Sequence, residues 1–199
     1  MRYKLLYWHG FDEAINGARL SYGRTSFDNF ESSEEDKKRL SEQLAGMDGG
    51  HNGFLEFIQY WILVQAPLYW WKQMGRYRHI SQISESTMHL SWKGGLVPSD
   101  FENPELIFAE TLDKLNWHIR EYCNCTPDEK DKKKELERTI ISNLPDAYLQ
   151  TRLLNVNAKC LRNIYFQRKD HKLKGLWSGE NGFCDFIEQL PKGGLICKK

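Results

Sequence analysis

Short runs of apolar residues predict the strands of this chain. Tyr3, Leu5 and Tyr7 alternate with their neighbours and predict a short opening strand. Residues 54–64 are almost continuously aromatic or aliphatic, which predicts a strand covered on both faces. Alternation returns over residues 80–90 and predicts a further strand.

Helical patterns fill much of the remaining chain. Ser33-Glu-Glu-Asp has the form of a capping box, and Leu40 and Leu44 follow it on one helical face. Pro67 suits the first turn of a helix that continues through Tyr77. Apolar spacings of three and four predict further helices over residues 11–22, 103–122, 133–143, 145–168 and 180–190.

The segments between these elements carry glycine or charge. Four glycines between residues 46 and 53 predict a loop. Residues 126–138 interleave acidic with basic side chains, which indicates a solvated helix face or linker and not a basic arm for nucleic acid. The mixture of strands and helices, with helices dominant, predicts an α+β fold in a single domain over residues 1–199.

Composition limits the class of protein. A chain of 199 residues with 40% hydrophobic content is long enough for one sizeable core. The net charge of +1 gives no overall attraction to nucleic acid or to acidic membranes, so any anion site must be a local cluster. The N-terminal apolar run is too short for a signal peptide, and no run reaches the ~18 residues of a membrane span. We therefore expect a cytoplasmic protein without membrane or nucleic-acid partners.

The cysteines predict neither disulfides nor a metal site. They are odd in number and scattered along the chain, which argues against a disulfide framework. Cys123-Asn-Cys125 has no second pair at zinc-like spacing. The five are Cys123, Cys125, Cys160, Cys184 and Cys197.

Residues 65–86 combine aromatic, basic and hydroxyl side chains more densely than any other segment. Arg76 and Arg78 lie between the aromatic cluster and a row of serines. Guanidinium groups form paired hydrogen bonds to phosphate oxygens, and hydroxyls can complete the shell, so the segment predicts an anion site. The alternative is a helix end whose basic residues face solvent and interact with the helix dipole.

The order of motifs along the chain resembles that of the flavin-dependent thymidylate synthases. Arg76-Tyr-Arg78-x-x-Ser81-x-x-x-x-Ser86 resembles that family's signature, Arg-His-Arg-x-x-Ser-x-Asn-Glu-x-Ser-x-Arg. The flanking motifs also occur in the family's order; they are Ala18-Arg-Leu-Ser-Tyr-Gly23, a glycine-rich loop with His51, Glu56-Phe57 opening a strand, Gln65-Ala-Pro67, and Asn157-x-Lys159 ahead of Gln167-Arg168.

The signature is altered at four positions. Tyr77 replaces its histidine, Ile83 its asparagine, Ser84 its glutamate and Met88 its final arginine. The family's later Gln-Trp-Glu-Ile-Arg stretch, whose arginine holds the nucleotide phosphate, has no clean counterpart after Arg168.

The resemblance implies a fold, a cofactor and a reaction. The implied fold has helices around a small, mainly antiparallel sheet and a helix-rich C-terminal half. The implied enzyme is an FAD-dependent pyrimidine nucleotide C5-methyltransferase that uses methylenetetrahydrofolate and NADPH to modify dUMP or a related nucleotide. Its sites would lie between the subunits of a homotetramer, and no metal is implied.

The resemblance also assigns residues to roles. The catalytic residues would be Arg76, Arg78 and Ser86. The flavin would be bound by Ser21, His51, Arg76, Tyr77, Arg78, Asn157 and Lys159. The nucleotide would be bound by Gln73, Arg76, Ser84, Ser86 and Arg168.

Several alternatives remain open. The protein could be a relative that keeps the fold but has lost the reaction, or one that acts on another nucleotide such as dCMP or UMP. A third alternative is a nucleic-acid-binding module in which bases stack on the aromatic and arginine side chains of residues 65–86. The near-neutral net charge disfavours this alternative. Individual residues also have structural readings: His51 as an exposed loop residue, His79 and His89 as polar strand residues, and Trp61, Trp70 and Trp71 as core or interface residues.

Overall fold

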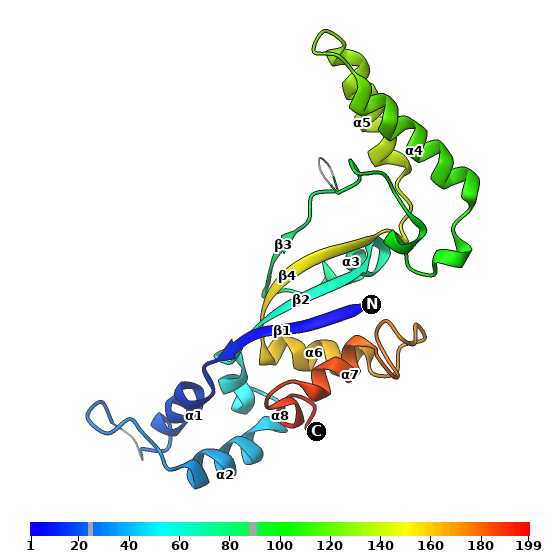
Figure 1. Ribbon diagram of the computed structural model, residues 1–199. Coiled ribbons are helices and arrows are strands. Elements are labelled where there is room, and N and C mark those ends of the chain that lie inside the picture. Colours follow the sequence, from blue (N-terminus) through cyan, green and yellow to red (C-terminus); the bar gives the residue numbers. More distant parts are fainter. Residues whose placement is uncertain (24–25, 88–90) are drawn as a thin grey trace.

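A four-stranded antiparallel sheet lies at the centre of the molecule (Figure 1). The computed structural model describes residues 1–23, 26–87 and 91–199. The spatial order of the strands is β1-β2-β4-β3. Their bounds are β1 Arg2–His9, β2 Gln59–Pro67, β3 Ile80–Ser84 and β4 Leu149–Asn157.

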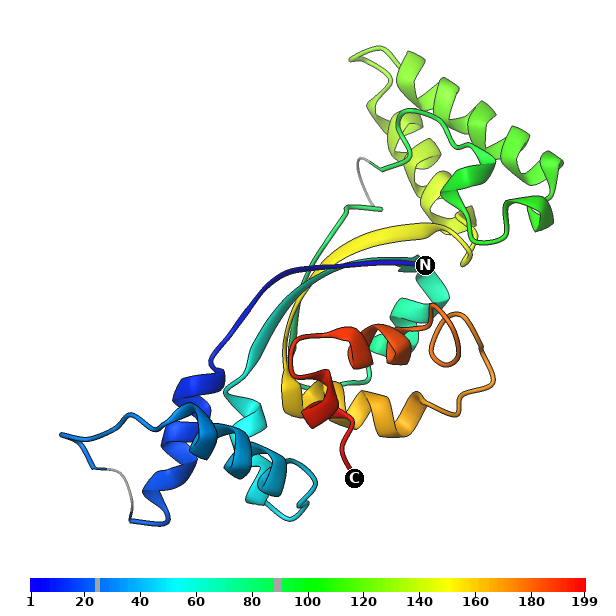
Figure 2. The same ribbon diagram turned by 60° about the horizontal axis from the view of Figure 1, so that its bottom comes forward.

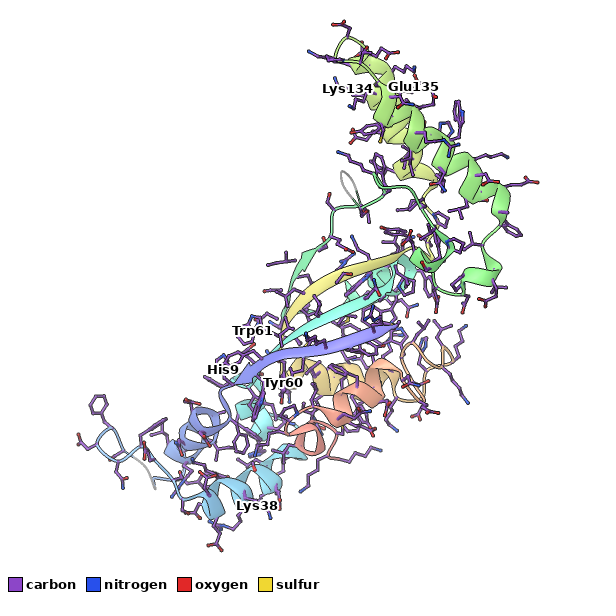
Figure 3. The ribbon with its side chains drawn as sticks, in the orientation of Figure 1. His9, Lys38, Tyr60, Trp61, Lys134 and Glu135 are labelled. Atoms are coloured by element: carbon purple, nitrogen blue, oxygen red, sulfur yellow. The ribbon has the colours of Figure 1, made fainter. Side chains whose placement is uncertain are left out.

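Only one face of the central strands β2 and β4 is buried within the described chain. Along β2 the side chains of Tyr60, Ile62 and Val64 are buried, whereas the alternate residues are only partly covered. This period of two is typical of a strand with one face on the core. The prediction of a strand covered on both faces was therefore wrong. Figure 3 shows His9 and Trp61 close together on the sheet, where their rings stack 5.3 Å apart.

The predicted helix over residues 145–168 was also wrong in its first half. Residues 149–157 form β4, and only Ala158–Arg168 is helical, as α6. Gln150, Leu154 and Val156 are buried at the period of a strand. Since β4 pairs with β2 on one side and β3 on the other, hydrogen bonds to distant segments decide its conformation.

Helices surround the sheet on one face and at both ends (Figure 2). α6, α7 and α8 lie against the buried face, α1 and α2 lie at one end, and α4 and α5 form an arm at the other. The bounds not yet given are α1 Phe11–Leu20, α2 Glu34–Ala45, α3 Leu68–Met74, α4 Ala109–Asn124, α5 Lys130–Asn143, α7 Phe183–Gln189 and α8 Gly193–Ile196. Three short 3-10 helices complete the list: η1 His51–Glu56, η2 Pro98–Asp100 and η3 Pro104–Leu106.

Two apolar clusters stabilise these parts. The larger one joins the sheet to α1, α3, α6 and α7, and it includes Trp70, Trp71 and Trp177. The smaller one joins the arm to neighbouring loops around Trp92 and Tyr122. The core reading is thus confirmed for Trp70 and Trp71, whereas Trp61 lies on the partly covered face of β2.

Local signals gave correct helix starts more often than correct strand ends. Ser33 caps α2 by accepting a hydrogen bond from the Asp36 amide, as the capping box predicts. Residues 54–56 belong to η1 and not to a strand, because β2 begins only at Gln59. The helix predicted from residue 103 is a 3-10 turn followed by α4. β3 ends at Ser84, and Met88 and His89 lie outside the described residues.

Within the described ranges, no helix has the length and apolar character that crossing a membrane requires.

Candidate anion-binding site

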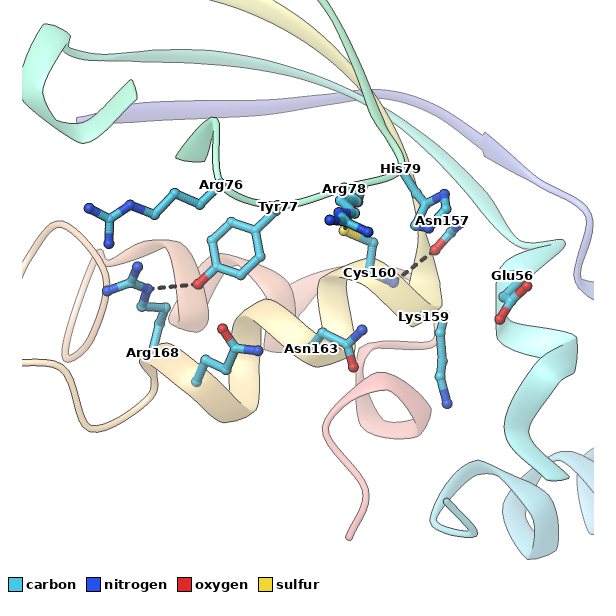
Figure 4. Close-up of a pocket in the computed structure, with 11 residues that line it drawn as sticks. Glu56, Arg76, Tyr77, Arg78, His79, Asn157, Lys159, Cys160, Asn163 and Arg168 are labelled. Carbon is cyan, nitrogen blue, oxygen red and sulfur yellow. Dashed lines mark hydrogen bonds between the residues drawn. The ribbon is translucent and has the colours of Figure 1, made fainter. Parts of the chain in front are cut away.

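A cavity of about 580 Å³ opens between the α3–β3 turn and helix α6 (Figure 4). The turn contributes four consecutive residues, 76–79, and α6 with its N-cap contributes a row of polar side chains. The lining residues are Glu56, Arg76, Tyr77, Arg78, His79, Asn157, Lys159, Cys160, Asn163, Gln167 and Arg168.

Backbone geometry places the turn over α6. α3 ends where the Gly75 amide donates to the Trp71 carbonyl, and the Tyr77 amide donates to the Met74 carbonyl. His79 has a φ of +64°, a left-handed conformation that few residues other than glycine adopt. This single residue redirects the chain into β3, so that residues 76–78 lie across the cavity mouth.

The cavity is strongly basic. Arg76, Arg78, Lys159 and Arg168 line it together with one carboxylate, Glu56. No ion pair joins any of these four cations to a carboxylate of the residues that the structure describes. A partly enclosed group of cations that outnumber the carboxylates beside them favours an anionic ligand, and guanidinium groups match phosphate in particular.

Arg168 is held in place from two sides. Its Nε donates to the Tyr77 hydroxyl at 2.7 Å, and its guanidinium carbon lies 4.7 Å from the centre of the Trp177 ring. Burial raises the pKa of Tyr77 despite the opposing effect of Arg168, so the phenol is neutral and accepts this bond at ordinary pH. Trp177 is itself fixed, because its Nε1 donates to Gln73 Oε1 at 2.9 Å. Arg168 is therefore preorganised with its terminal nitrogens outside these bonds.

Lys159 and Asn157 are also fixed by neighbours. The Asn157 side chain caps α6 by accepting from the Cys160 amide at 2.8 Å. Lys159 Nζ donates to Asn52 Oδ1. Asn52 is fully buried in η1 and donates in turn to Asp48 Oδ1 at 3.0 Å. That hydrogen bond, followed by the charge of Arg162, lowers the pKa of Asp48. The position of Lys159 thus depends on a segment more than a hundred residues away in sequence.

The single thiol of the cavity is poorly suited to act as a nucleophile. Cys160 is buried, and its Sγ donates to the Arg78 carbonyl at 3.2 Å. Burial raises the pKa of this thiol to about 11. Because the thiolate is the reactive form, Cys160 is nearly all unreactive thiol near neutral pH.

This thiol gives a direct test by alkylation. At pH 8 we expect iodoacetamide to modify the exposed Cys123 long before Cys160, since a pKa of about 11 leaves roughly one thiolate in a thousand. The rate at Cys160 should rise about tenfold when the pH is raised from 8 to 9. Peptide mass spectrometry over time measures both rates. Equal rates at the two cysteines at pH 8 would contradict the buried, protonated state.

The structure brings six of the predicted site residues into this cavity. They are Arg76, Tyr77, Arg78, Asn157, Lys159 and Arg168. Arg168 was expected beside the nucleotide, but it lies with the residues assigned to the flavin. Glu56, His79, Cys160, Asn163 and Gln167 were not predicted as ligands. Spacings of three and four residues along α6 from Asn157 would have found the last three.

The other predicted residues do not line the cavity of one chain. Ser21 is exposed at the end of α1, where its hydroxyl donates to the Ala18 carbonyl at 2.8 Å. His51 is exposed in η1, beside the buried Asn52. Gln73 has its side-chain oxygen engaged by Trp177. Ser84 and Ser86 lie at the far end of β3 and just beyond it. The neighbouring Glu85 carboxylate accepts from the Thr151 amide at 2.7 Å.

Over residues 1–23, 26–87 and 91–199, no group of three or more His, Cys, Asp or Glu side chains could hold a metal ion.

Comparison with known proteins yields one family and a set of solved structures. The family model for thymidylate synthase complementing protein matches residues 5–174. No curated protein gives a significant match. The flavin-dependent thymidylate synthase ThyX from Helicobacter pylori, complexed with FAD and dUMP, covers 100% of both chains with a TM-score of 0.67 and 16% identity.

Two further structures show the same fold. A second structure of Thymidylate Synthase X from Helicobacter pylori, with FAD and dUMP, gives a TM-score of 0.65 at 16% identity and covers 98% of this chain and 96% of that one. The UMP/dUMP methylase PolB from Streptomyces cacaoi, bound with 5-Br dUMP, gives a TM-score of 0.61 at 14% identity. This match covers 94% of this chain and 87% of that one. At these identities the likeness establishes the α+β fold with a small antiparallel sheet, which confirms the predicted fold class.

Proposed function

Because the chain belongs to the thymidylate synthase complementing protein family, we propose that it is an FAD-dependent enzyme that modifies carbon 5 of a pyrimidine deoxynucleotide, dUMP or a relative. The one-carbon unit would come from methylenetetrahydrofolate and the reducing equivalents from NADPH. The observation that carries the proposal is the cavity with four cations that no described carboxylate pairs with.

The cations of the cavity suit the negative charge of the FAD diphosphate. Arg78, Arg168 and Lys159 approach the cavity from two elements, so they can neutralise two neighbouring phosphates from different sides. Tyr77 adds aromatic surface next to Arg168, and the buried Trp177 ring supports the guanidinium from behind. FAD, when bound, would supply the transfer of the one-carbon unit and of the hydride; the chain itself would bind and orient the reactants.

We assign distinct roles to the three proposed catalytic residues. Arg76 and Arg78 would hold anionic oxygens of the flavin and nucleotide and bring the two rings together. Both are exposed at the cavity rim, so they can also reach a ligand held by a second subunit. The Ser86 hydroxyl would orient the nucleotide by a hydrogen bond. This is catalysis by positioning and by electrostatics, and it requires no cysteine nucleophile.

A homotetramer with sites between subunits belongs to the same proposal. Ser21, His51, Ser84 and Ser86 lie outside the cavity of their own chain, and this supports sites that combine residues from several subunits. The partly covered sheet face around Trp61 also leaves room for a neighbouring subunit.

The absorption spectrum of the purified protein tests flavin binding. We expect either a yellow protein or one that takes up FAD stoichiometrically when it is supplied. Protein that is colourless and gains no flavin on incubation with FAD would overturn the proposal. The reaction itself is tested with FAD, NADPH, methylenetetrahydrofolate and dUMP, with the methylated base detected by mass spectrometry.

A substrate-switched or inactive relative is the second candidate. Ser84 provides no carboxylate where the signature has one, and the side chain of Ile83 is 72% exposed on the other face of β3. These residues leave fewer polar groups to orient a base, which would alter substrate choice or abolish turnover. An assay with dUMP, UMP and dCMP in parallel separates the candidates, because only an inactive relative methylates none of the three.

A further inference from the structure

Arg152 lies in the sheet interior, outside the cavity described above. It is a residue of β4 and is paired directly with Ser84 of β3. Side chains of directly paired residues lie on the same face, with Cβ atoms about 4.5–5.5 Å apart. Gln82 lies on this face too, because it alternates with Ser84 along β3, and the contact of Arg152 with Trp71 places this face on the side of α3. Ser86 follows two residues after Ser84, just beyond the strand.

The Arg152 guanidinium is held in a defined orientation. Its Nε donates to Gln150 Oε1 at 2.9 Å, and its Nη1 donates to Gln82 Oε1, also at 2.9 Å. Its carbon lies 4.5 Å from the centre of the Trp71 ring. Gln150 is anchored in turn, because its Nε2 donates to the Glu85 carbonyl at 2.7 Å. The Arg152 Nη2 forms no hydrogen bond with a described residue, so its N–H groups remain free to donate to a ligand.

The charge of Arg152 has no counter-charge in the described chain. No ion pair joins Arg152 to a described Asp or Glu, and the nearby Glu85 carboxylate accepts from the Thr151 amide. The side chain is half-buried, and this burial lowers the pKa of the guanidinium. A cation that is partly removed from water without a counter-charge is costly, and a bound anion would offset that cost.

The separation from the cavity points to a second ligand. Arg152 precedes the cavity residue Asn157 by five positions on the same strand, which corresponds to roughly 16 Å at ~3.3 Å per residue. A single phosphate cannot contact both places. If the cavity takes the diphosphate of FAD, an anion at Arg152 belongs to a different molecule.

We propose that Arg152 binds the phosphate monoester of the nucleotide substrate, with the hydroxyls of Ser84 and Ser86 as neighbouring donors. The identification of the ligand as a nucleotide rests on the proposed function, whereas the need for an anion follows from the uncompensated guanidinium. Arg152 is thus a specificity-determining residue that discriminates nucleotides from nucleosides.

Calorimetric titration of the intact protein with dUMP, deoxyuridine and inorganic phosphate tests this role. For Arg152→Gln we expect the affinity for dUMP to fall about 10- to 100-fold, the loss expected when one charge-assisted hydrogen bond is removed. Deoxyuridine carries no phosphate, so its weaker binding should be unchanged. FAD affinity, measured by flavin fluorescence, should change by less than about twofold because its site is separate.

Two variants separate this role from a structural one. Arg152→Lys keeps the charge and should recover part of the dUMP affinity. Arg120→Gln removes an exposed arginine of α4 and should leave all affinities as in the parent protein. If Arg152→Gln does not fold, the lysine variant still tests the proposal, because loss of the planar fork should reduce dUMP affinity and spare deoxyuridine.

The outcomes distinguish this inference from the proposed function. Unchanged dUMP affinity in Arg152→Gln, or equal losses for dUMP and deoxyuridine, would overturn the role of Arg152. Binding of inorganic phosphate that depends on Arg152, in a protein that takes up no flavin, would overturn the proposed function and leave the anion site standing. Absence of binding of either phosphate compound to the parent protein would overturn the anion site itself.

Discussion

Replacement of Arg168 by alanine should weaken FAD binding about 10- to 100-fold, or roughly 1.5–3 kcal/mol. The guanidinium is fixed by the Tyr77 hydroxyl and by the Trp177 ring, so little conformational entropy is lost when it binds a phosphate. Its removal takes one of four cations from the cavity and leaves a space that water must fill. Flavin fluorescence titration at fixed ionic strength measures the effect.

Two further variants show whether FAD binding depends on the orientation of the Arg168 guanidinium in addition to its charge. Tyr77→Phe keeps the guanidinium but removes its acceptor, and we expect a smaller loss of about 2- to 10-fold. Arg120→Ala on α4 removes an exposed arginine of the same charge and should have no effect. FAD affinity that survives in Arg168→Ala would show that the cavity does not hold the diphosphate.

Replacement of Trp70 by alanine should lower the free energy of unfolding by about 3–5 kcal/mol. Trp70 is completely buried and stacks on Trp177 at 4.6 Å, with Trp71 and Phe183 edge-on at 4.8 and 5.5 Å. Since a whole domain is stable by only about 5–15 kcal/mol, this variant should be close to unfolding at 37 °C. Urea unfolding followed by circular dichroism measures the change.

Trp70→Phe is the matched control for this variant. Among the described residues, Trp70 Nε1 has no hydrogen-bond partner, so phenylalanine removes an unpaired N–H together with some volume. We therefore expect a much smaller loss than for alanine. Trp117→Ala, at a site that is 51% exposed, should change stability by less than about 0.5 kcal/mol. A similar loss for all three would mean that the aromatic cluster does not stabilise the fold.

Elements that are specified by neighbouring residues could be predicted from the sequence. The cap at Ser33 and the opening strand each depend on residues within a few positions. The helix predicted through Tyr77 was wrong at its end, because α3 stops at Met74 and the arginines lie in a turn. The central strand β4 could not be predicted in this way. Leu149 to Asn157 is a strand because β2 and β3 supply hydrogen bonds along both of its edges, and neither is near it in sequence.

The residues of the candidate site also differ in whether the sequence alone could identify them. The segment 76–78 and the pair Asn157 and Lys159 were identified from the order of motifs, and the structure brings them to one cavity. The hydrogen bond from Lys159 to Asn52 and the packing of Arg168 on Trp177 could not be foreseen, since each joins segments whose contact depends on the fold. Arg152 was missed for this reason too: its environment consists of Trp71, Gln82 and Gln150.

The position of β4 also has a consequence for protein synthesis. β3 has β4 as its only neighbour in the described sheet, and β2 needs β4 on its inner edge. β3, which carries the signature serine Ser81, therefore stays unpaired until the ribosome has produced residues 149–157, more than sixty positions later. Such long sequence separations slow folding and expose apolar strands in the nascent chain. We expect chaperone dependence to be greatest for nascent chains that end before Leu149.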